Sequence, residues 1–381
     1  MEMEGEKTTI IALSMMSILI MTPLLQGCAT GQAYKEEPIT IGAILILTGT
    51  GSNWGENSRR GGDLAIKELN AKGGVIGRPV RMDYEDNPSD DPASAVTALN
   101  NLAAKDVKVV IGTTWSTSGL AVAPVACDEK ILMVSPTLGM ADFNERCDYL
   151  QNIWPHDVTL SVELGRHIYE TGHRSLAILG SQTVWEDAQA RAVRKGYEDA
   201  GGKTVAFELP PGDSQDFKTE LLRIKEADPD SVYIQVTFQQ IAARQLRQIG
   251  IEAPVYGVLT DEDRIIGAQG TLEGATILSS LTPTAAFTQK YKEEYGKEPD
   301  IGSDTAYDAV MLVAKAITET KSTDPTALKD YIRSLDRYTG GSGELTFDGA
   351  GGVTKPFKTM QVRGNKTVEV TRQKEPDPGA R

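Results

Sequence analysis

Five hydroxyl side chains crowd one short loop of this chain. Residues 107–111 form an apolar, β-branched run that predicts a buried strand, and a helix is expected over 118–127. The loop between them holds one tryptophan with hydroxyls on both sides of it: Thr113, Thr114, Trp115, Ser116, Thr117 and Ser118. Unpaired amides at a helix start, with hydroxyls beside them, can bind a small anion such as a carboxylate. Ser116 or Ser118 could instead simply cap the helix, so the loop alone leaves both interpretations open.

Strands and helices alternate along the chain that carries this loop. Apolar runs predict strands and periodic stretches between them predict helices: strands over 39–47, 80–84 and 107–111, helices over 57–71 and 92–105. The same alternation starts again after Pro155. It indicates an α/β fold with parallel sheets, whose ligands bind outside the carboxyl ends of the strands. A chain of 381 residues is long enough for about two such domains.

The sequence offers few of the residue sets that catalysis requires. Its three histidines, His156, His167 and His173, belong to no HExxH motif, and no CxxC, GxSxG or GxxxxGK[ST] motif occurs. Glycines at 49, 51 and 55 follow the first strand with a spacing that differs from the dinucleotide-binding GxGxxG. The acidic run at 261–263 is typical of a solvated face in so acidic a chain. We therefore predict a protein that is not an enzyme and that needs no cofactor and no metal.

Acidic residues outnumber basic ones in the whole chain. The sequence has 53 Asp and Glu against 39 Lys and Arg, a formal net charge of −14. Nucleic-acid binding depends on cationic side chains that neutralise phosphates. The composition therefore argues against nucleic acid as a partner.

An apolar segment opens the chain. Residues 8–25 end in Leu25 and are followed by Gln26, Gly27 and Cys28, so residues 1–28 resemble a bacterial lipoprotein signal with its lipobox. Cys28 would then be lipidated, residues 29–37 would form a polar tether, and the rest of the chain would lie in the periplasm or at the cell surface, anchored to the membrane. The leader carries acidic residues at its start, unlike most such signals. A single transmembrane helix is the alternative.

Two further cysteines follow the lipobox, Cys127 and Cys147. An oxidising compartment allows a disulfide bond between them. Two cysteines 20 positions apart can equally remain free and buried. The sequence leaves both possibilities open.

A more specific pattern follows the tether, in the stretch ILTGTGSNWGENSRRGGDLAIKELNAKGGVIGRPVRMDYEDNPSDDPASAV. Its characteristic residues are Thr48-Gly49, Gly55, Asn70, Gly73-Gly74, Gly77-Arg78, Asp86 and Asp91-Pro92. They resemble the opening of the leucine/isoleucine/valine-binding protein family, the solute-binding components of ABC importers, and the similarity continues over about residues 39–370. The resemblance implies the two-lobed type I periplasmic-binding-protein fold, in which each lobe is a mostly parallel sheet flanked by helices. Three chain crossings connect the lobes of that fold.

The resemblance also implies the domain boundaries. Lobe 1 would contain residues 38–153 plus 284–341, and lobe 2 would contain residues 154–283 plus 342–371. Short strands at 344–347 and 359–370 would finish on lobe 2. Residues 372–381 are expected to form a disordered tail.

The family's ligand contacts can be carried over to positions of this chain. They imply a site formed by Trp54, Ser116, Thr117, Ser118, Thr137, Gly139, Trp185 and Phe238. Gly139 lacks the hydroxyl that the family usually presents at that place. The acidic residue that receives a ligand ammonium aligns near Leu259, unless a gap brings Asp261 into its position.

All four tryptophans fall on loops that are expected to line the cleft: Trp54, Trp115, Trp154 and Trp185. Each one separately is more often a core residue. Together they predict an aromatic-walled pocket that suits flat or aliphatic bodies.

The predicted function is therefore that of an extracytoplasmic solute-binding protein of an ABC importer. It would bind a branched-chain or aromatic amino acid between the lobes and deliver it to a membrane permease. A carboxylate without an amino group, such as an aromatic acid, is the competing ligand, because the ammonium site is weakly defined. A ligand-sensing receptor on the same fold is a further alternative.

Overall fold

The computed structural model describes residues 37–370. The expected lipoprotein signal with Cys28, almost all of the tether over 29–37 and the expected tail over 372–381 lie outside the described residues. Within 37–370 no helix is both long enough and apolar enough to cross a membrane. The described residues belong to one compact unit of the chain.

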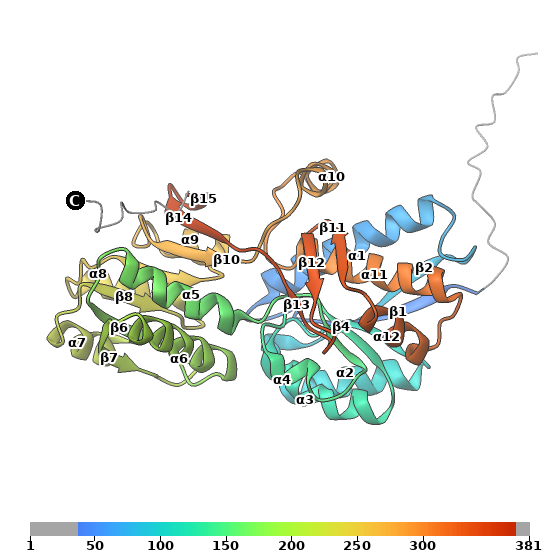
Figure 1. Cartoon of the computed structure of the whole chain (residues 1–381), viewed down its shortest axis with the longest axis horizontal. Coiled ribbons are helices and arrows are strands. Elements are labelled where there is room, and N and C mark those ends of the chain that lie inside the picture. Colours follow the sequence, from blue (N-terminus) through green and yellow to red (C-terminus); the bar gives the residue numbers. More distant parts are fainter. Residues whose placement is uncertain (1–36, 371–381) are drawn as a thin grey trace, which may run out of the picture. The chain divides into compact units, whose positions relative to one another are not determined.

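A five-stranded parallel sheet in the order β2-β1-β3-β4-β5 forms the centre of the first lobe (Figure 1). Its strands are β1 (Ile39–Leu45), β2 (Val80–Asp86), β3 (Val109–Gly112), β4 (Leu132–Ser135) and β5 (Leu150–Asn152). Side chains of a strand alternate between the two faces, so Ala43 belongs to one buried cluster and Ile44 to another. Both faces are therefore covered, as is usual for parallel sheets.

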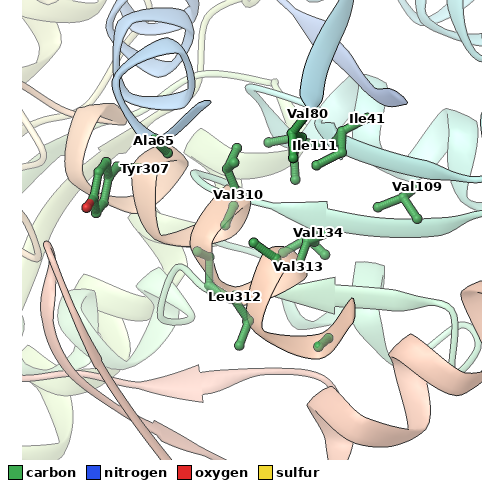
Figure 2. Close-up of a cluster of buried hydrophobic side chains, with 14 of the residues drawn as sticks. Ile41, Ala65, Val80, Val109, Ile111, Val134, Tyr307, Val310, Leu312 and Val313 are labelled. Carbon is green, nitrogen blue, oxygen red and sulfur yellow. The ribbon is translucent and has the colours of Figure 1, made fainter. Parts of the chain in front are cut away.

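Helices cover the two faces of this sheet. One core contains side chains of α1 (Ser52–Ala71), α10 (Ala285–Tyr295), α11 (Ser303–Thr320) and α12 (Pro325–Arg333). The other contains α2 (Pro92–Ala104), α3 (Ser116–Asp128) and α4 (Ala141–Asn144), with the short 3₁₀ helix η1 (Pro88–Asp90) just before α2. Figure 2 shows part of the first core, where Val310 and Val313 of α11 lie with Ile111 and Val134 of the sheet.

Close packing of α1 against α11 depends on a glycine. A Cβ added to Gly61 would lie 2.0 Å from the carbonyl oxygen of Ser303, so no larger residue fits there without moving the helices apart. α11 is thereby held against α1, although the two helices are more than two hundred residues apart in the chain. The first lobe is therefore built from two separate stretches of sequence.

A seven-stranded sheet in the order β15-β14-β10-β9-β8-β6-β7 forms the second lobe. Five strands are parallel: β6 (Ser175–Leu179), β7 (Lys203–Glu208), β8 (Ser231–Ile234), β9 (Val255–Val258) and β10 (Thr276–Ser279). β14 (Lys358–Arg363) and β15 (Lys366–Glu369) pair antiparallel at one edge. One face is covered by α5 (Asp157–Glu170) and α6 (Val184–Asp199), the other by α7 (Lys218–Glu226), α8 (Gln239–Gln248) and α9 (Glu262–Gly267). This arrangement confirms the predicted α/β, two-lobed, mostly parallel fold.

The prediction for residues 342–354 is wrong. β11 (Arg337–Gly340), β12 (Gly343–Phe347) and β13 (Val353–Thr354) form a separate three-stranded antiparallel sheet. Leu345 and Val353 are buried in the first-lobe core with α11. The turn between β11 and β12 is tied to that helix, because Asp308 accepts hydrogen bonds from the amides of Gly341 and Ser342 at 2.6 and 2.8 Å.

Three segments carry the chain between the two lobes: residues 153–156, 280–284 and 355–357. The expected boundary between residues 341 and 342 falls instead in the hairpin turn between β11 and β12. The true third crossing follows β13.

A disulfide bond joins Cys127, in the last turn of α3, to Cys147, in the segment before β5. The two Cα atoms are 6.1 Å apart, within the range that a disulfide spans. Of the two states that the sequence left open, the structure has the bonded one. It links two elements of the first lobe.

Candidate ligand-binding site

A cavity of about 360 Å³ is lined by residues of both lobes. The first lobe contributes Thr50, Trp54, Ser89, Asp90, Trp115, Ser116, Thr117 and Thr137. The second lobe contributes Asp157, Thr183, Trp185, Glu186, Gly212, Asp213, Thr237, Phe238 and Arg264. Almost all of them follow the carboxyl ends of parallel strands, where α/β sheets bind their ligands.

Most of the residues singled out from the sequence line this cavity. They are Trp54, Trp115, Ser116, Thr117, Thr137, Trp185 and Phe238. The strand-to-helix loops bring them together, because each lobe directs the carboxyl ends of its strands toward the cavity. Their part in ligand binding stays a prediction.

Ser118 lies outside the cavity lining. Its side chain is fully buried and its Oγ accepts a hydrogen bond from Nδ2 of Asn87 at 2.7 Å. Its amide donates to Oδ1 of Asp90 at 3.3 Å. α3 begins at Ser116, two residues earlier than expected, so Ser118 points into the lobe from the first turn.

Gly139 also lies outside the lining, and the structure explains its missing hydroxyl. A Cβ at this position would be 1.7 Å from Oδ2 of Asp157, and the Gly139 carbonyl accepts the Asp157 amide at 2.9 Å. The loop after β4 therefore passes directly against the start of α5. Any side chain at 139 would displace Asp157.

Asp261 is the third expected contact that does not reach the cavity. It is 2% exposed, caps α9 by accepting the amide of Arg264, and accepts the indole N–H of Trp54 at 2.8 Å. Its Oδ2 also lies 3.1 Å from Nη1 of Arg264. The expectation of a solvated face holds for Glu262 and Asp263 only. Leu259, the other aligned position, is buried and lies outside the lining as well.

Three of the four tryptophans line the cavity and the fourth does not. The rings of Trp54 and Trp115 meet edge to face with centroids 5.9 Å apart. Trp154 is fully buried beneath the cavity residues, and its indole N–H donates to Oδ1 of Asp157 at 2.8 Å. The prediction that Trp154 lines the cleft is therefore wrong, because its ring is part of the second-lobe core.

Asp157 was not predicted from the sequence. Its carboxylate is fully buried and accepts two indole N–H groups, from Trp154 on Oδ1 and from Trp185 on Oδ2, both at 2.8 Å. Burial raises the pKa of this carboxyl group to about 7, and the two hydrogen bonds oppose the rise. Asp157 thus fixes the orientation of the Trp185 wall.

Glu186 was also missed. Burial raises its pKa, and hydroxyl groups of Ser181, Thr183 and Thr237 donate to its two oxygens, the latter two at 3.1 and 3.0 Å. Thr183 in turn accepts the amide of Glu186 at 3.2 Å and so caps the start of α6. The sequence Thr183-Val184-Trp185-Glu186 carries that signal.

Asp90 lies in η1, after β2, and lines the cavity while only 8% exposed. Burial raises the pKa of its carboxyl group to about 6, against hydrogen bonds from the amides and hydroxyls of Thr117 and Ser118. The helix start that was expected to hold a ligand carboxylate therefore already holds a carboxylate of the protein. No separate sequence signal marked Asp90, since its neighbour Asp91 is the residue that caps α2.

Arg264 is the only lysine or arginine among the described residues that line the cavity. Its guanidinium group lies 3.1 Å from Asp261 and 6.0 Å from the centroid of the Trp54 ring. It was overlooked because it follows an acidic run. Within residues 37–370 no group of three or more His, Cys, Asp or Glu side chains is arranged to hold a metal ion.

Known proteins resemble the chain over most of its length. The leucine-, isoleucine-, valine-, threonine-, and alanine-binding protein of Pseudomonas aeruginosa is 27% identical over 329 residues, which cover 83% of this chain and 87% of that protein. The substrate-binding protein LivJ of Streptococcus pneumoniae, solved with isoleucine, has a TM-score of 0.81 at 23% identity and covers 87% of this chain and 100% of its own. A solute-binding protein of an ABC transporter from Rhodopseudomonas palustris, solved with 3,4-dihydroxybenzoic acid, has a TM-score of 0.80 at 21% identity and covers 88% and 97%.

The family model described as periplasmic binding protein matches residues 38–367. This match spans both lobes and the residues that line the cavity. It confirms the resemblance found in the sequence. The chain belongs to the periplasmic binding protein family.

Proposed function

We propose that this protein is the solute-binding component of an ABC importer and that it binds an amino acid with an apolar or aromatic side chain. The observation that carries the proposal is the composition of the cavity, in which aromatic walls meet hydroxyl groups and a buried carboxylate. A pocket of this kind encloses an apolar body and fixes its polar end. The bound solute would then be delivered to a membrane permease.

The walls suit the side chain of such a solute. Trp54, Trp115, Trp185 and Phe238 come from both lobes, so a ligand between them contacts the two lobes at once. Aromatic rings bury a large area without losing many rotamers on binding. Ser116 offers its hydroxyl group to the ligand's carboxylate from the first turn of α3.

The mechanism is closure of the two lobes on the ligand. Hinge motion at the segments 153–156, 280–284 and 355–357 changes the distance between the walls, and a ligand that bridges them stabilises the closed form. The closed form is then the one that docks on the permease. The sequence has no GxxxxGK[ST] motif, so the energy for transport comes from the ATPase partner.

A carboxylate without an amino group, such as an aromatic acid, is the second candidate ligand. Asp261, the expected acceptor of an ammonium group, is already engaged by Trp54 and Arg264. Arg264 offers a guanidinium group to a carboxylate. The Rhodopseudomonas palustris relative with 3,4-dihydroxybenzoic acid supports this second candidate.

A thermal-shift screen of the purified protein tests the proposal. The panel contains all proteinogenic amino acids together with aromatic and aliphatic carboxylates that lack an amino group. A ligand at 100 times its Kd adds about 2.7 kcal/mol to the free energy of unfolding, which raises the Tm by several degrees. We expect a shift with leucine, isoleucine, valine or phenylalanine. A shift with the amino-free acids alone would replace the amino acid by the second candidate, and no shift at all would contradict both.

We further propose that Cys28 anchors the protein to the membrane through a lipid. The support is the Leu25-Gln26-Gly27-Cys28 sequence after an apolar run. Mass spectrometry of the protein from its membrane fraction should find acyl chains on an amino-terminal Cys28. A Cys28→Ser variant that remains acylated and membrane-bound would contradict the proposal.

A further inference from the structure

Four carboxylates line the cavity: Asp90, Asp157, Glu186 and Asp213. A ligand ammonium group needs one that is shielded from water and keeps acceptor capacity on its cavity side. The four differ in their exposure to water and in their hydrogen-bond partners. Their hydrogen bonds and exposure therefore indicate which of them can recognise an amino group.

The two second-lobe carboxylates that are buried serve the protein itself. Each oxygen of Asp157 accepts one indole N–H, and the two oxygens of Glu186 share three hydroxyl donors. Burial raises the pKa of Glu186, and the nearby positive charge of Arg264 opposes that rise. Asp157 is only 1% exposed and Glu186 only 5% exposed, so a ligand ammonium group reaches little of either carboxylate, and at Glu186 it would also approach a cation.

Asp213 is exposed in the loop that follows β7. Water screens the charge of an exposed carboxylate, and such groups contribute little to an ion pair. Asp213 is therefore a poor candidate and a useful control. Asp90 remains.

Asp90 is buried on one side against the protein and open on the other to the cavity. Its protein partners are the amides and hydroxyls at the start of α3, among them the Ser118 amide at 3.3 Å. These groups stabilise its negative charge but bring no cation close to it. The charge of this carboxylate therefore stays uncompensated at the cavity wall.

The position of Asp90 also argues against a ligand carboxylate on the same amides. The amides of Thr117 and Ser118 already donate to Asp90, and a second anion there would be repelled. An α-amino acid carries its ammonium and carboxylate groups on the same carbon atom, Cα. Its ammonium can thus face Asp90 while its carboxylate reaches Ser116, the first residue of α3.

We propose that Asp90 of the first lobe binds the ligand's amino group, so that the protein selects amino acids over the matching acids without an amino group. This inference rests on the proposed function. It assigns ammonium recognition to the loop after β2 instead of to Asp261 or another acid of the second lobe.

Isothermal titration calorimetry with matched probes tests the assignment. L-leucine and L-phenylalanine are compared with 4-methylpentanoate and 3-phenylpropanoate, which lack only the amino group. The wild-type protein should bind the amino acids at least tenfold more tightly than their amino-free partners. Asp90→Asn should weaken amino-acid binding ten- to a hundredfold, the range expected for one charge-assisted contact, and should remove most of the discrimination.

Two further variants keep the result interpretable. Asp213→Asn removes the exposed lining carboxylate and should change amino-acid affinity less than threefold. Asp90→Ser removes the charge but keeps a hydroxyl oxygen that can accept a hydrogen bond from the α3 amides. If Asp90→Asn fails to fold, the affinity of a folded Asp90→Ser protein is measured in its place. Circular dichroism and the Tm report folding for each variant.

The outcomes separate this inference from the function on which it rests. If the wild-type protein binds amino acids and a folded Asp90 variant binds them equally well, the assignment of Asp90 is wrong and the proposed function stands. If the wild-type protein binds only the amino-free acids, the second candidate ligand is correct and the assignment is overturned. If it binds none of the probes, the proposed function fails and the assignment fails with it.

Discussion

The two lobes contribute different chemistry to the same cavity. The first lobe presents the hydroxyl groups of Ser116 and Thr117 and the uncompensated carboxylate of Asp90. The second lobe has more charged residues at the cavity, but its carboxylates Asp157 and Glu186 are buried and accept hydrogen bonds from indole and hydroxyl groups of the same lobe. Charge at a cavity wall is therefore not the same as charge available to a ligand.

This difference suggests a division of roles. A buried carboxylate whose oxygens accept hydrogen bonds from the protein's own side chains holds those side chains in place, as Asp157 holds Trp185. A carboxylate with partners on one side only can still accept a donor from the ligand. We expect the second lobe to supply rigid walls and the first lobe to supply recognition, and four predictions probe this contrast.

The largest effect should come from removing Trp154. This fully buried side chain lies at the first crossing between the lobes and donates to Asp157. Trp154→Ala should lower the free energy of unfolding by about 3–5 kcal/mol, as large-to-small changes at buried aromatic residues do. Denaturant titration measures the loss. Trp154→Phe keeps most of the volume and should cost clearly less; equal losses would show that the indole N–H, and not packing, dominates.

The charge state of Asp157 should make stability depend on pH. Its pKa rises from 3.8 to about 7 on folding, so between these values the folded protein binds a proton that the unfolded chain has released. Stability should therefore fall as the pH rises from about 4 to 7, by up to about 4 kcal/mol for this group alone. Comparing the pH profiles of the Tm for wild type and Asp157→Asn isolates the group. If the Tm of the two proteins changed with pH in the same way, Asp157 would be charged over the whole range, and burial would not raise its pKa.

Reduction of the disulfide should weaken the first lobe selectively. The bond between Cys127 and Cys147 closes a loop of 20 residues, and cross-links of that length contribute roughly 3 kcal/mol. Hydrogen exchange of the Cys127→Ser/Cys147→Ser protein should show that the amides of α3 lose protection before those of α6. Equal loss of protection in both helices would show that the lobes unfold as one cooperative unit.

The smallest effect separates two neighbouring serines of α3. Ser116→Ala removes a hydroxyl that lines the cavity and should weaken ligand binding by about 1.5–3 kcal/mol, the range for a hydrogen bond to a charged group. Ser118→Ala should lower stability, because it deprives Nδ2 of Asn87 of its acceptor, and should weaken ligand binding less than Ser116→Ala, because the Ser118 hydroxyl acts on the ligand only through Asp90. Calorimetry and thermal unfolding of the two variants measure both quantities. A stronger affinity loss for Ser118→Ala would reverse the assignment of these residues.

The sequence by itself determined the alternation of strands and helices, and with it the α/β fold. It also located the walls of the cavity, because in a parallel sheet the loops after the strands meet at one edge whatever their exact conformation. Trp115 and the hydroxyl loop at Ser116 and Thr117 were found in this way, whereas the family resemblance supplied Trp54, Trp185 and Phe238. Sequence motifs and the spacing of apolar residues were sufficient to locate these residues, because both are local properties of the chain.

Only the tertiary structure decided which polar groups remain available. Asp261 accepts the indole N–H of Trp54, 207 positions away in the chain. A side chain at position 139 would collide with Asp157. Residues 343–354 join the first lobe because Leu345 and Val353 pack against α11. Burial and hydrogen-bond pairing depend on contacts between distant parts of the chain, and they set the charge of each carboxylate. For that reason the walls of the site follow from the sequence, whereas the chemistry that faces the ligand follows from the fold.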